Sequence, residues 1–239
     1  MRNIWAVREA IPTVIKLDAP TADCGIIGQM FCRILNRAEI TLAGDCGGRE
    51  RATPFPVAKI AITINEFDWD FFTCEGRMFV SERMRQAMAL DPADVRYFDV
   101  DARQSPPGPR GMDYQIMEPA VSDDVSDHSM TDEEWKRHVA DHIAAEETGV
   151  PAPTNGVKIR PDAAPAHDLF YDAPRGRLFC TDAFALRVLN SGCIDMCFPV
   201  PSHMYGANVR YRTLQGIEEY VGWDEEANEP ILRLVETLD

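Results

Sequence analysis

The sequence predicts an α+β fold, in which a mixed sheet with two pseudo-repeated β-α-β units is packed with helices. The main observation is an internal repeat. The stretch "EGRMFVSERMRQAMALDPADVRYFDV" at residues 75–100 returns in the same phase as "RGRLFCTDAFALRVLNSGCIDMCFPV" at residues 175–200. The second observation is composition, because 239 residues with 45% hydrophobic content suffice for a sizeable core. We expect one α+β domain over residues 1–239, with repeat units at about 67–100 and 167–200.

Each copy of the repeat predicts a strand that runs directly into a capped helix. Ser81 in the first copy and Thr181 in the second follow a short apolar strand, and an acid comes next, Glu82 or Asp182. Ser and Thr are favourable N-caps, and an acid in the first turn is stabilised by the helix dipole. A second strand ending in Phe-x-Val closes each unit.

Several residues of the two copies are expected to occupy equivalent positions. Asp68, just upstream of the first copy, is expected to correspond to Asp168. The identical residues are Gly76, Arg77, Phe79, Phe98 and Val100, which recur as Gly176, Arg177, Phe179, Phe198 and Val200. Such residues build cores and turns, so the repeat by itself predicts architecture and not catalysis.

Hydrophobic spacing predicts further elements outside the repeat. Residues 22–37 carry apolar side chains at helical spacing, which predicts an amphipathic helix. Isoleucines alternate with other residues in 57–65, as is typical of a strand. Thr131 is expected to cap a helix over 131–147. The final stretch "ILRLVETLD" fits a helix or a strand.

The charge balance narrows the classes of partner. The chain has 24 Lys and Arg against 39 Asp and Glu, a net charge of −15. Such a surface repels phosphate backbones and anionic lipid, and attracts a basic protein or a cation. No apolar run approaches the ~20 residues of a membrane helix, and charges at Arg8, Glu9 and Lys16 make the N-terminal stretch unlike a secretory signal peptide. The seven cysteines, an odd number, predict reduced thiols and therefore a cytoplasmic protein. The negative charge and the lack of a long apolar run predict that it binds neither nucleic acid nor membrane.

A series of short motifs runs across residues 65–201 in a definite order. It consists of "DFF…GRMFVSERMRQAM…VRYFDV…DYQIMEP", then "SDDVSD", then "HDLFYD…GRLFCTDAFALRVLNSGCIDMCFPV". This order resembles immunity protein family eleven of bacterial polymorphic-toxin systems. Asp124 and Ser126 stand where that family has Asp-x-x-Ser, with one residue fewer between them. The resemblance implies a non-enzymatic cytoplasmic protein, without a cofactor, that binds and neutralises one cognate toxin, possibly a nuclease-type effector.

The acidic composition and this resemblance indicate the same kind of partner. Nuclease toxins tend to be basic because they hold phosphates, and an acidic protein attracts such a surface. Trp135, beside an acidic segment, is a possible aromatic anchor. The candidate residues at the toxin interface are Asp123, Asp124, Asp127, Asp132, Glu133, Glu134 and Trp135. The alternatives are a solvated acidic loop and a core position for Trp135.

Two motifs suggest catalytic chemistry instead. "GDCGG" around Cys46 is similar to the nucleophile turn of chymotrypsin-like cysteine proteases, but there the base precedes the nucleophile, and the first histidine here is His128. "HVADH" places His138, Asp141 and His142 on one helix, close to the inverted zinc-protease pattern His-x-x-Glu-His. The alternative function is therefore a zinc-dependent hydrolase, although two histidines lack the three or four protein ligands that zinc takes. We expect a binding protein and no enzyme.

Overall fold

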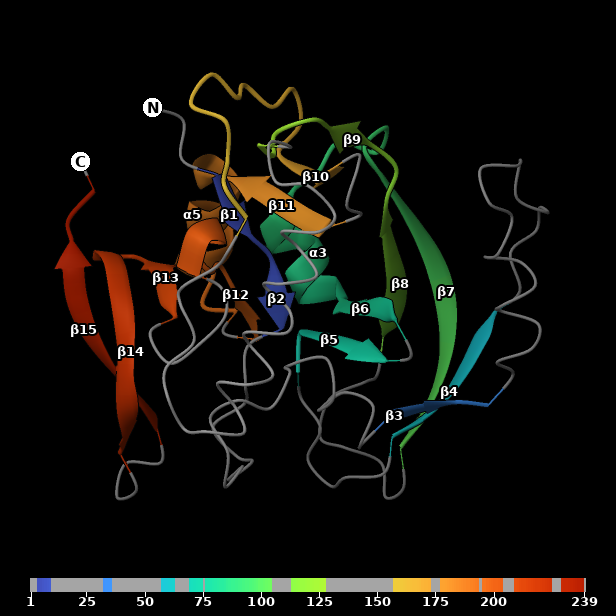
Figure 1. Ribbon diagram of the computed structural model, residues 1–239. Helices are drawn as coiled ribbons and strands as arrows, with labels where there is room; N and C mark the ends of the chain where they lie inside the picture. Colours follow the sequence, from blue (N-terminus) through green and yellow to red (C-terminus); the bar gives the residue numbers. More distant parts are fainter. Residues whose placement is uncertain are drawn as a thin grey trace, which may run out of the picture.

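The computed structural model combines helices with sheets of parallel and antiparallel strands, which confirms the predicted α+β class (Figure 1). The structure describes residues 4–9, 32–35, 57–62, 69–74, 76–104, 113–127, 157–172, 177–193, 195–203, 209–224 and 229–238. Helices α3 (Glu82–Met88) and α5 (Asp182–Asn190) belong to the two repeat units. Within these ranges, no helix has the length and apolar character needed to cross a membrane.

The first sheet has six strands in the order β3-β4-β7-β8-β6-β5. The strands are β3 (Cys32–Ile34), β4 (Ala58–Ile62), β5 (Phe71–Cys74), β6 (Arg77–Ser81), β7 (Val95–Gln104) and β8 (Tyr114–Pro119). Both β6 and β7 pair antiparallel with β8, so they run parallel to each other with β8 between them. The unit β6-α3-β7 is therefore a β-α-β unit split by a third strand.

Strand β3 corrects the prediction of a helix over residues 22–37. Residues 22–31 lie outside the described ranges, but Cys32–Ile34 pairs antiparallel with β4. Ile34 is buried in a cluster that includes Ile60 of β4. Pairing with a neighbouring strand outweighs the helical spacing of the apolar residues, because local propensity is weaker than tertiary contacts.

The second unit repeats this arrangement with the N-terminal segment in the middle. It combines the second sheet, of order β1-β11-β10-β9, with a separate two-stranded sheet in which β12 pairs with β2. The strands are β1 (Ile4–Ala6), β2 (Arg8–Glu9), β9 (Ser122–Asp123), β10 (Leu169–Asp172), β11 (Arg177–Thr181) and β12 (Met196–Cys197). Residues 4–9 pair antiparallel first with β11 and then with β12. The unit β11-α5-β12 is therefore split too, and residues 4–9 take the place that β8 has in the first unit.

The largest hydrophobic cluster is shared by the two units, whose helices pack against each other. Met84 and Met88 of α3 and Phe184 and Val188 of α5 are fully buried in it. Strands of both units and residues next to them contribute Trp5, Val7, Phe71, Val80, Val95, Met117, Leu169, Cys180, Met196 and Phe198. The opposite face of each sheet carries a separate cluster. Burial at this central interface is the main hydrophobic contribution that ties the two units together.

Phe98 and Phe198 are not equivalent, contrary to the sequence alignment. Phe98 packs in the cluster on the opposite face of the first sheet, whereas Phe198 lies in the central cluster. Tyr97 takes the corresponding central position in the first unit. The helix and loops before β12 are together one residue longer than those before β7, and a shift of one residue turns a strand side chain to the other face. Val100 and Val200 differ in the same way.

Asp70, and not Asp68, is the counterpart of Asp168. The amide of Ser81 donates to the Asp70 carbonyl at 2.9 Å and its hydroxyl donates to the Asp70 carboxylate; Thr181 makes the same two bonds to Asp168, at 2.9 and 2.8 Å. The turn between β10 and β11 is two residues longer than that between β5 and β6, which moves the alignment by two positions. Asp68 itself lies outside the described ranges.

Both helix caps predicted within the repeat are confirmed, whereas Thr131 and the helix expected over 131–147 lie outside the described ranges. The hydroxyl oxygens of Ser81 and Thr181 accept from the backbone N–H three residues later, at 3.1 and 3.3 Å. Arg187 of α5 forms an ion pair with Asp168 at 2.7 Å and donates to the carbonyl of Met88, the last residue of α3. One guanidinium thus joins the cap of the second helix to the end of the first.

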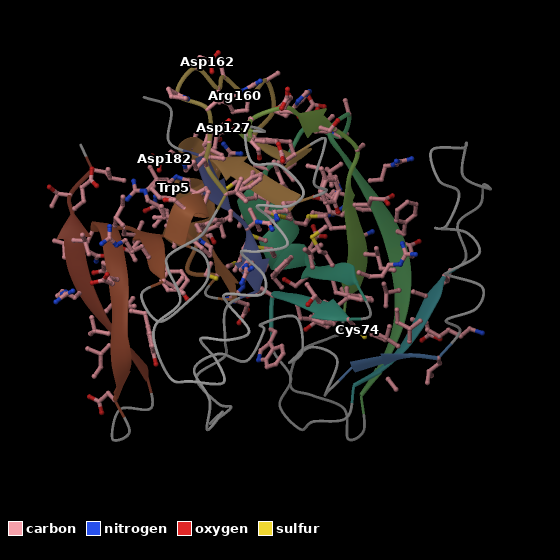
Figure 2. The ribbon with its side chains drawn as sticks, viewed as in Figure 1. Trp5, Cys74, Asp127, Arg160, Asp162 and Asp182 are labelled. Carbon is pink, nitrogen blue, oxygen red and sulfur yellow. The ribbon has the colours of Figure 1, made fainter. Side chains whose placement is uncertain are left out.

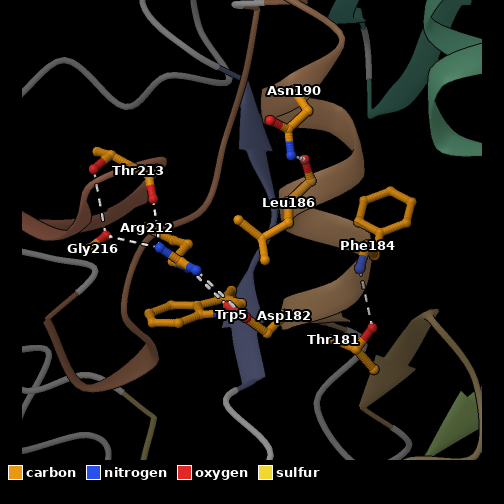
Figure 3. Close-up of polar contacts among 9 residues, drawn as sticks. All are labelled: Trp5, Thr181, Asp182, Phe184, Leu186, Asn190, Arg212, Thr213 and Gly216. Atoms are coloured by element: carbon orange, nitrogen blue, oxygen red, sulfur yellow. Dashed lines mark hydrogen bonds and ion pairs between the residues drawn. The ribbon is translucent and has the colours of Figure 1, made fainter. Parts of the chain in front are cut away.

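A third sheet, formed by the C-terminal strands, docks on the second unit. It contains β13 (Arg210–Thr213), β14 (Gly216–Asp224) and β15 (Glu229–Glu236), after the short 3-10 helix η1 (Pro201–His203). Its main polar attachment is Arg212, whose Nε donates to Asp182 Oδ1 at 2.8 Å (Figure 3). The indole of Trp5 donates to the same oxygen, also at 2.8 Å. The last stretch of sequence, which fitted a helix or a strand, is strand β15.

Trp5 is expected to stabilise the second unit mainly through its ring. Trp5 is 2% exposed, so Trp5→Ala should lower the free energy of unfolding by about 3–5 kcal/mol. Trp5→Phe keeps a six-membered aromatic ring but loses the bond to Asp182 and the packing of the rest of the indole, so its loss should be smaller, about 1–2 kcal/mol. Urea unfolding followed by circular dichroism measures both, and equal losses would contradict this division.

Asp168 makes stability depend on acid pH. Burial would raise the pKa of its carboxyl, but the hydrogen bonds from Arg187 and Thr181 and the charge of Arg187 outweigh burial and lower the pKa. A carboxyl whose pKa is lower in the folded state contributes its full stability above its unfolded pKa, near 3.8, and loses it as the pH falls through the folded pKa.

The free energy of unfolding of Asp168→Asn should therefore fall less than that of the wild type as the pH drops from about 5 to about 2. Urea titrations across this range test it, with Asp113→Asn at an exposed position as the control. Parallel curves for the wild type and Asp168→Asn would show that this ion pair does not form in solution.

Candidate functional site

The structure separates the predicted interface residues into two groups. Asp123 ends strand β9, and Asp124 and Asp127 lie in the loop that follows (Figure 2). Outside the described ranges lie Asp132, Glu133, Glu134 and Trp135, and also His138, Asp141 and His142 of the zinc alternative. The site can therefore be built from the β9 loop and the residues that hold it.

The β9 loop is fastened to the segment that precedes β10. The amide of Asp127 donates to the carbonyl of Lys158 at 2.8 Å, and the amide of Arg160 donates to the carbonyl of Val125 at 2.9 Å. An antiparallel bridge between Ser126 and residue 159 lies between these two bonds. The two segments thus behave as a short two-stranded ribbon, which fixes the positions of the side chains on it.

A buried serine and aspartate anchor this ribbon to the second sheet. Asp172, the last residue of β10, has no exposed surface, and neither does Ser126. The Ser126 hydroxyl donates to Asp172 Oδ2 at 2.7 Å, and the amides of Val125 and Ser126 donate to Oδ1 at 3.3 and 3.2 Å. Three donors satisfy a carboxylate that would otherwise be costly to bury. Ser126 thus takes Asp172, and not Asp124, as its acidic partner.

Asp123 has a structural role. Its Oδ2 accepts from the amides of Ala166 and His167 at 3.1 and 3.2 Å, and it lies 3.2 Å from His167 Nδ1. The other ring nitrogen of His167 lies 3.9 Å from Asp94 Oδ1 in the first unit. The side chain of Asp123 is only 15% exposed. Its carboxylate fixes the segment that leads into β10, and it is poorly placed to bind a basic group of another protein.

Two exposed acids, Asp124 and Asp162, lie near Arg160, and Asp127, which is partly buried, belongs to the same ribbon (Figure 2). Arg160 Nη1 lies 3.2 Å from Asp124 Oδ2, and its Nη2 donates to the Asp124 carbonyl. Arg160 Nε lies 4.0 Å from Asp162 Oδ1. Asp124 is 51% exposed and Asp162 is 87% exposed. We name Asp124, Asp127 and Asp162 the acidic ribbon surface.

The carboxylates of this region differ in how far their own chain already occupies them. Among the described residues, no three His, Cys, Asp or Glu side chains gather closely enough to hold a metal ion. The buried carboxylate of Asp172 is already occupied by donors from its own chain. Exposed carboxylates on a fixed ribbon can instead bind basic groups of another molecule.

Sequence reasoning missed the residues that hold the ribbon in place. Asp172 closes the apolar strand "LFYD", and an acid at the end of an otherwise buried strand is a signal for a buried hydrogen-bonded carboxylate. His167 carries no such signal, because its partners Asp123 and Asp94 are distant in the sequence.

The Ser126–Asp172 contact should make a large coupled contribution to stability. Ser126→Ala should lower the free energy of unfolding by about 1–3 kcal/mol, and Asp172→Ala by roughly 3 kcal/mol or more because three donors lose their acceptor. The double variant should cost less than the sum of the two, with a coupling energy of about 0.5–3 kcal/mol. Denaturant unfolding of the four proteins measures this, and additive losses would mean that the two side chains do not interact.

A comparison with protein-family models finds no match for this chain, and a comparison with curated proteins also finds none. The resemblance to immunity protein family eleven therefore stays a prediction that rests on the order of the motifs in the sequence.

Proposed function

We propose that this chain is an immunity protein that binds and neutralises a cognate bacterial toxin, such as a nuclease-type effector. The supporting observation is that exposed carboxylates, Asp124 and Asp162, lie on a ribbon held in place by buried hydrogen bonds. The net charge of −15 means that the whole molecule also attracts basic partners. A basic toxin surface matches both features.

Binding would act through charge and through a preformed shape. The Asp172 carboxylate and the backbone bonds between 125–127 and 158–160 keep the acidic ribbon surface ordered before a partner arrives. A preformed surface loses little conformational entropy on binding. The acidic field of the chain would speed the encounter with a basic protein, an effect that salt weakens. Arg160, between the acids, can offer a single cationic contact to an acidic group on the toxin.

Growth rescue tests the proposed function directly. The toxin gene expected beside this gene is induced in a bacterial host with and without this protein. We expect growth arrest that this protein relieves, and a stoichiometric complex of the two purified proteins. An adjacent product that is not toxic, or that forms no complex, would remove the proposed function and leave the fold as described.

Charge reversal locates the interface once the complex is in hand. Asp124→Lys/Asp162→Lys changes two exposed acids and leaves Asp123 and Asp172 intact, so the ribbon should stay folded. The association rate constant at low salt should fall by about tenfold or more, and its salt dependence should become weaker. Stopped-flow or surface plasmon resonance measures both quantities.

The matched control is Asp99→Lys/Asp113→Lys, which changes the net charge by the same amount at exposed positions in the first sheet, near residue 115. Its association rate should stay within about threefold of the wild type, since distant charges are screened. Equal losses in both double variants would show that total charge matters and that the interface lies elsewhere.

A further inference from the structure

Strand β15 is an unusual edge in this molecule. The third sheet has the order β13-β14-β15, so β15 pairs with β14 on one side and with no described strand on the other. Figure 1 shows β14 and β15 as a long hairpin at the left margin, away from the helices. The other strands at sheet edges are two to four residues long, whereas β15 has eight residues. Short edge strands are one way in which proteins prevent unwanted pairing, and β15 lacks that protection.

Both faces of β15 expose apolar side chains. Ile231 and Leu234 are 45% and 47% exposed, and Leu232 and Val235 are exposed as well. Because neighbouring strand residues point to opposite faces, Ile231 and Leu232 place apolar surface on both sides of the sheet. Six of the eight large apolar residues that the described ranges expose belong to this sheet or to its turn. Concentrated apolar exposure of this kind marks an interaction surface.

The charges of β15 are arranged so that the strand complements itself. Arg233 is its only basic residue, and Glu229 lies four positions earlier with Ile231 halfway between them. In an antiparallel pair of two identical strands centred on Ile231, position 233 of each copy stands opposite position 229 of the other. Opposite charges at directly opposed positions stabilise such a pair. If the pair were centred on Arg233, the two Arg233 side chains would stand opposite each other and repel. The order of charges therefore favours the register centred on Ile231 over the one centred on Arg233.

We propose that β15 docks on β15 of a second copy of this chain, antiparallel and centred on Ile231, so that the two three-stranded sheets become one continuous sheet. The dimer follows from the exposed edge and from the order of charges on the strand, and it does not rest on the proposed toxin. The pairing would satisfy the outer backbone groups of β15 to which no described strand pairs, except at Pro230, which has no N–H, and it would cover the apolar residues beside the axis.

Sedimentation velocity and light scattering of the full-length protein test the dimer. We expect a mass that rises with concentration to twice the 26.8 kDa of one chain. The mass of a single chain at every concentration would overturn the proposal and indicate that another molecule covers β15. Val57→Lys, at an exposed apolar position just before strand β4, is the matched control for Ile231→Lys. The dissociation constant should rise by about tenfold or more for Ile231→Lys and stay unchanged for Val57→Lys.

Charge exchange tests the register. Arg233→Glu and Glu229→Arg should each weaken the dimer, and an equimolar mixture of the two variants should restore it, because each opposed pair then holds opposite charges. Failure of the mixture to dimerise more tightly than either variant alone would overturn the proposed pairing.

Cross-linking covers the case in which Arg233→Glu unfolds the sheet, since Arg233 forms an ion pair with Glu219. Residues on the axis of an antiparallel pair have Cα atoms about 4.5–5.5 Å apart, within the range that a disulfide spans. Ile231→Cys should therefore give a covalent dimer on mild oxidation, well above the level of the wild type with its seven cysteines and of Val57→Cys. Equal cross-linking in all three proteins would overturn the register.

Discussion

The carboxylate of Asp182 holds three separate parts of the chain together. It lies in the first turn of α5, where an acid is favoured by the helix dipole. The indole of Trp5 and the guanidinium of Arg212 both donate to it at 2.8 Å. Arg212 is buried; its Nη2 also donates to the Asp182 carboxylate, at 3.5 Å, and its Nη1 donates to the carbonyls of Thr213 and Gly216 in its own hairpin. The N-terminal strand, the second helix and the C-terminal sheet thus share one acceptor, and charge-assisted bonds of this kind are stronger than neutral ones.

The sequence alone could predict the local features of the two units but not the strands that complete them. Ser81 and Thr181 cap their helices because cap and helix are neighbours in the chain. The positions of β8 and of residues 4–9 inside the units depend on pairing between distant segments, for which the repeat carries no signal. Because of a difference of one residue in loop length, Phe198 is not the counterpart of Phe98, and because of a difference of two residues, Asp168 corresponds to Asp70 and not to Asp68.

For the candidate site, too, the sequence could predict some features and not others. Asp123 and Asp124 are adjacent acids, and no feature of the sequence distinguishes them. Because alternate strand residues face opposite sides, one turns inward to the amides of 166 and 167 and the other stays at the surface beside Arg160. The acidic composition could therefore predict the character of the surface, while the choice of residues needed the pairing of the ribbon.

The central place of residues 4–9 has a consequence for how the chain is made. A ribosome releases the chain from its N-terminus, so the strands β5 to β8 of the first unit emerge close together and can pair at once. Trp5 precedes the first unit in the chain and must wait for Asp182, 177 positions later. The strand β1 can pair with β11 only after that interval, and closing so long a loop is the slow, entropically opposed step of folding. The second unit is therefore the one whose nascent form depends on protection from other proteins.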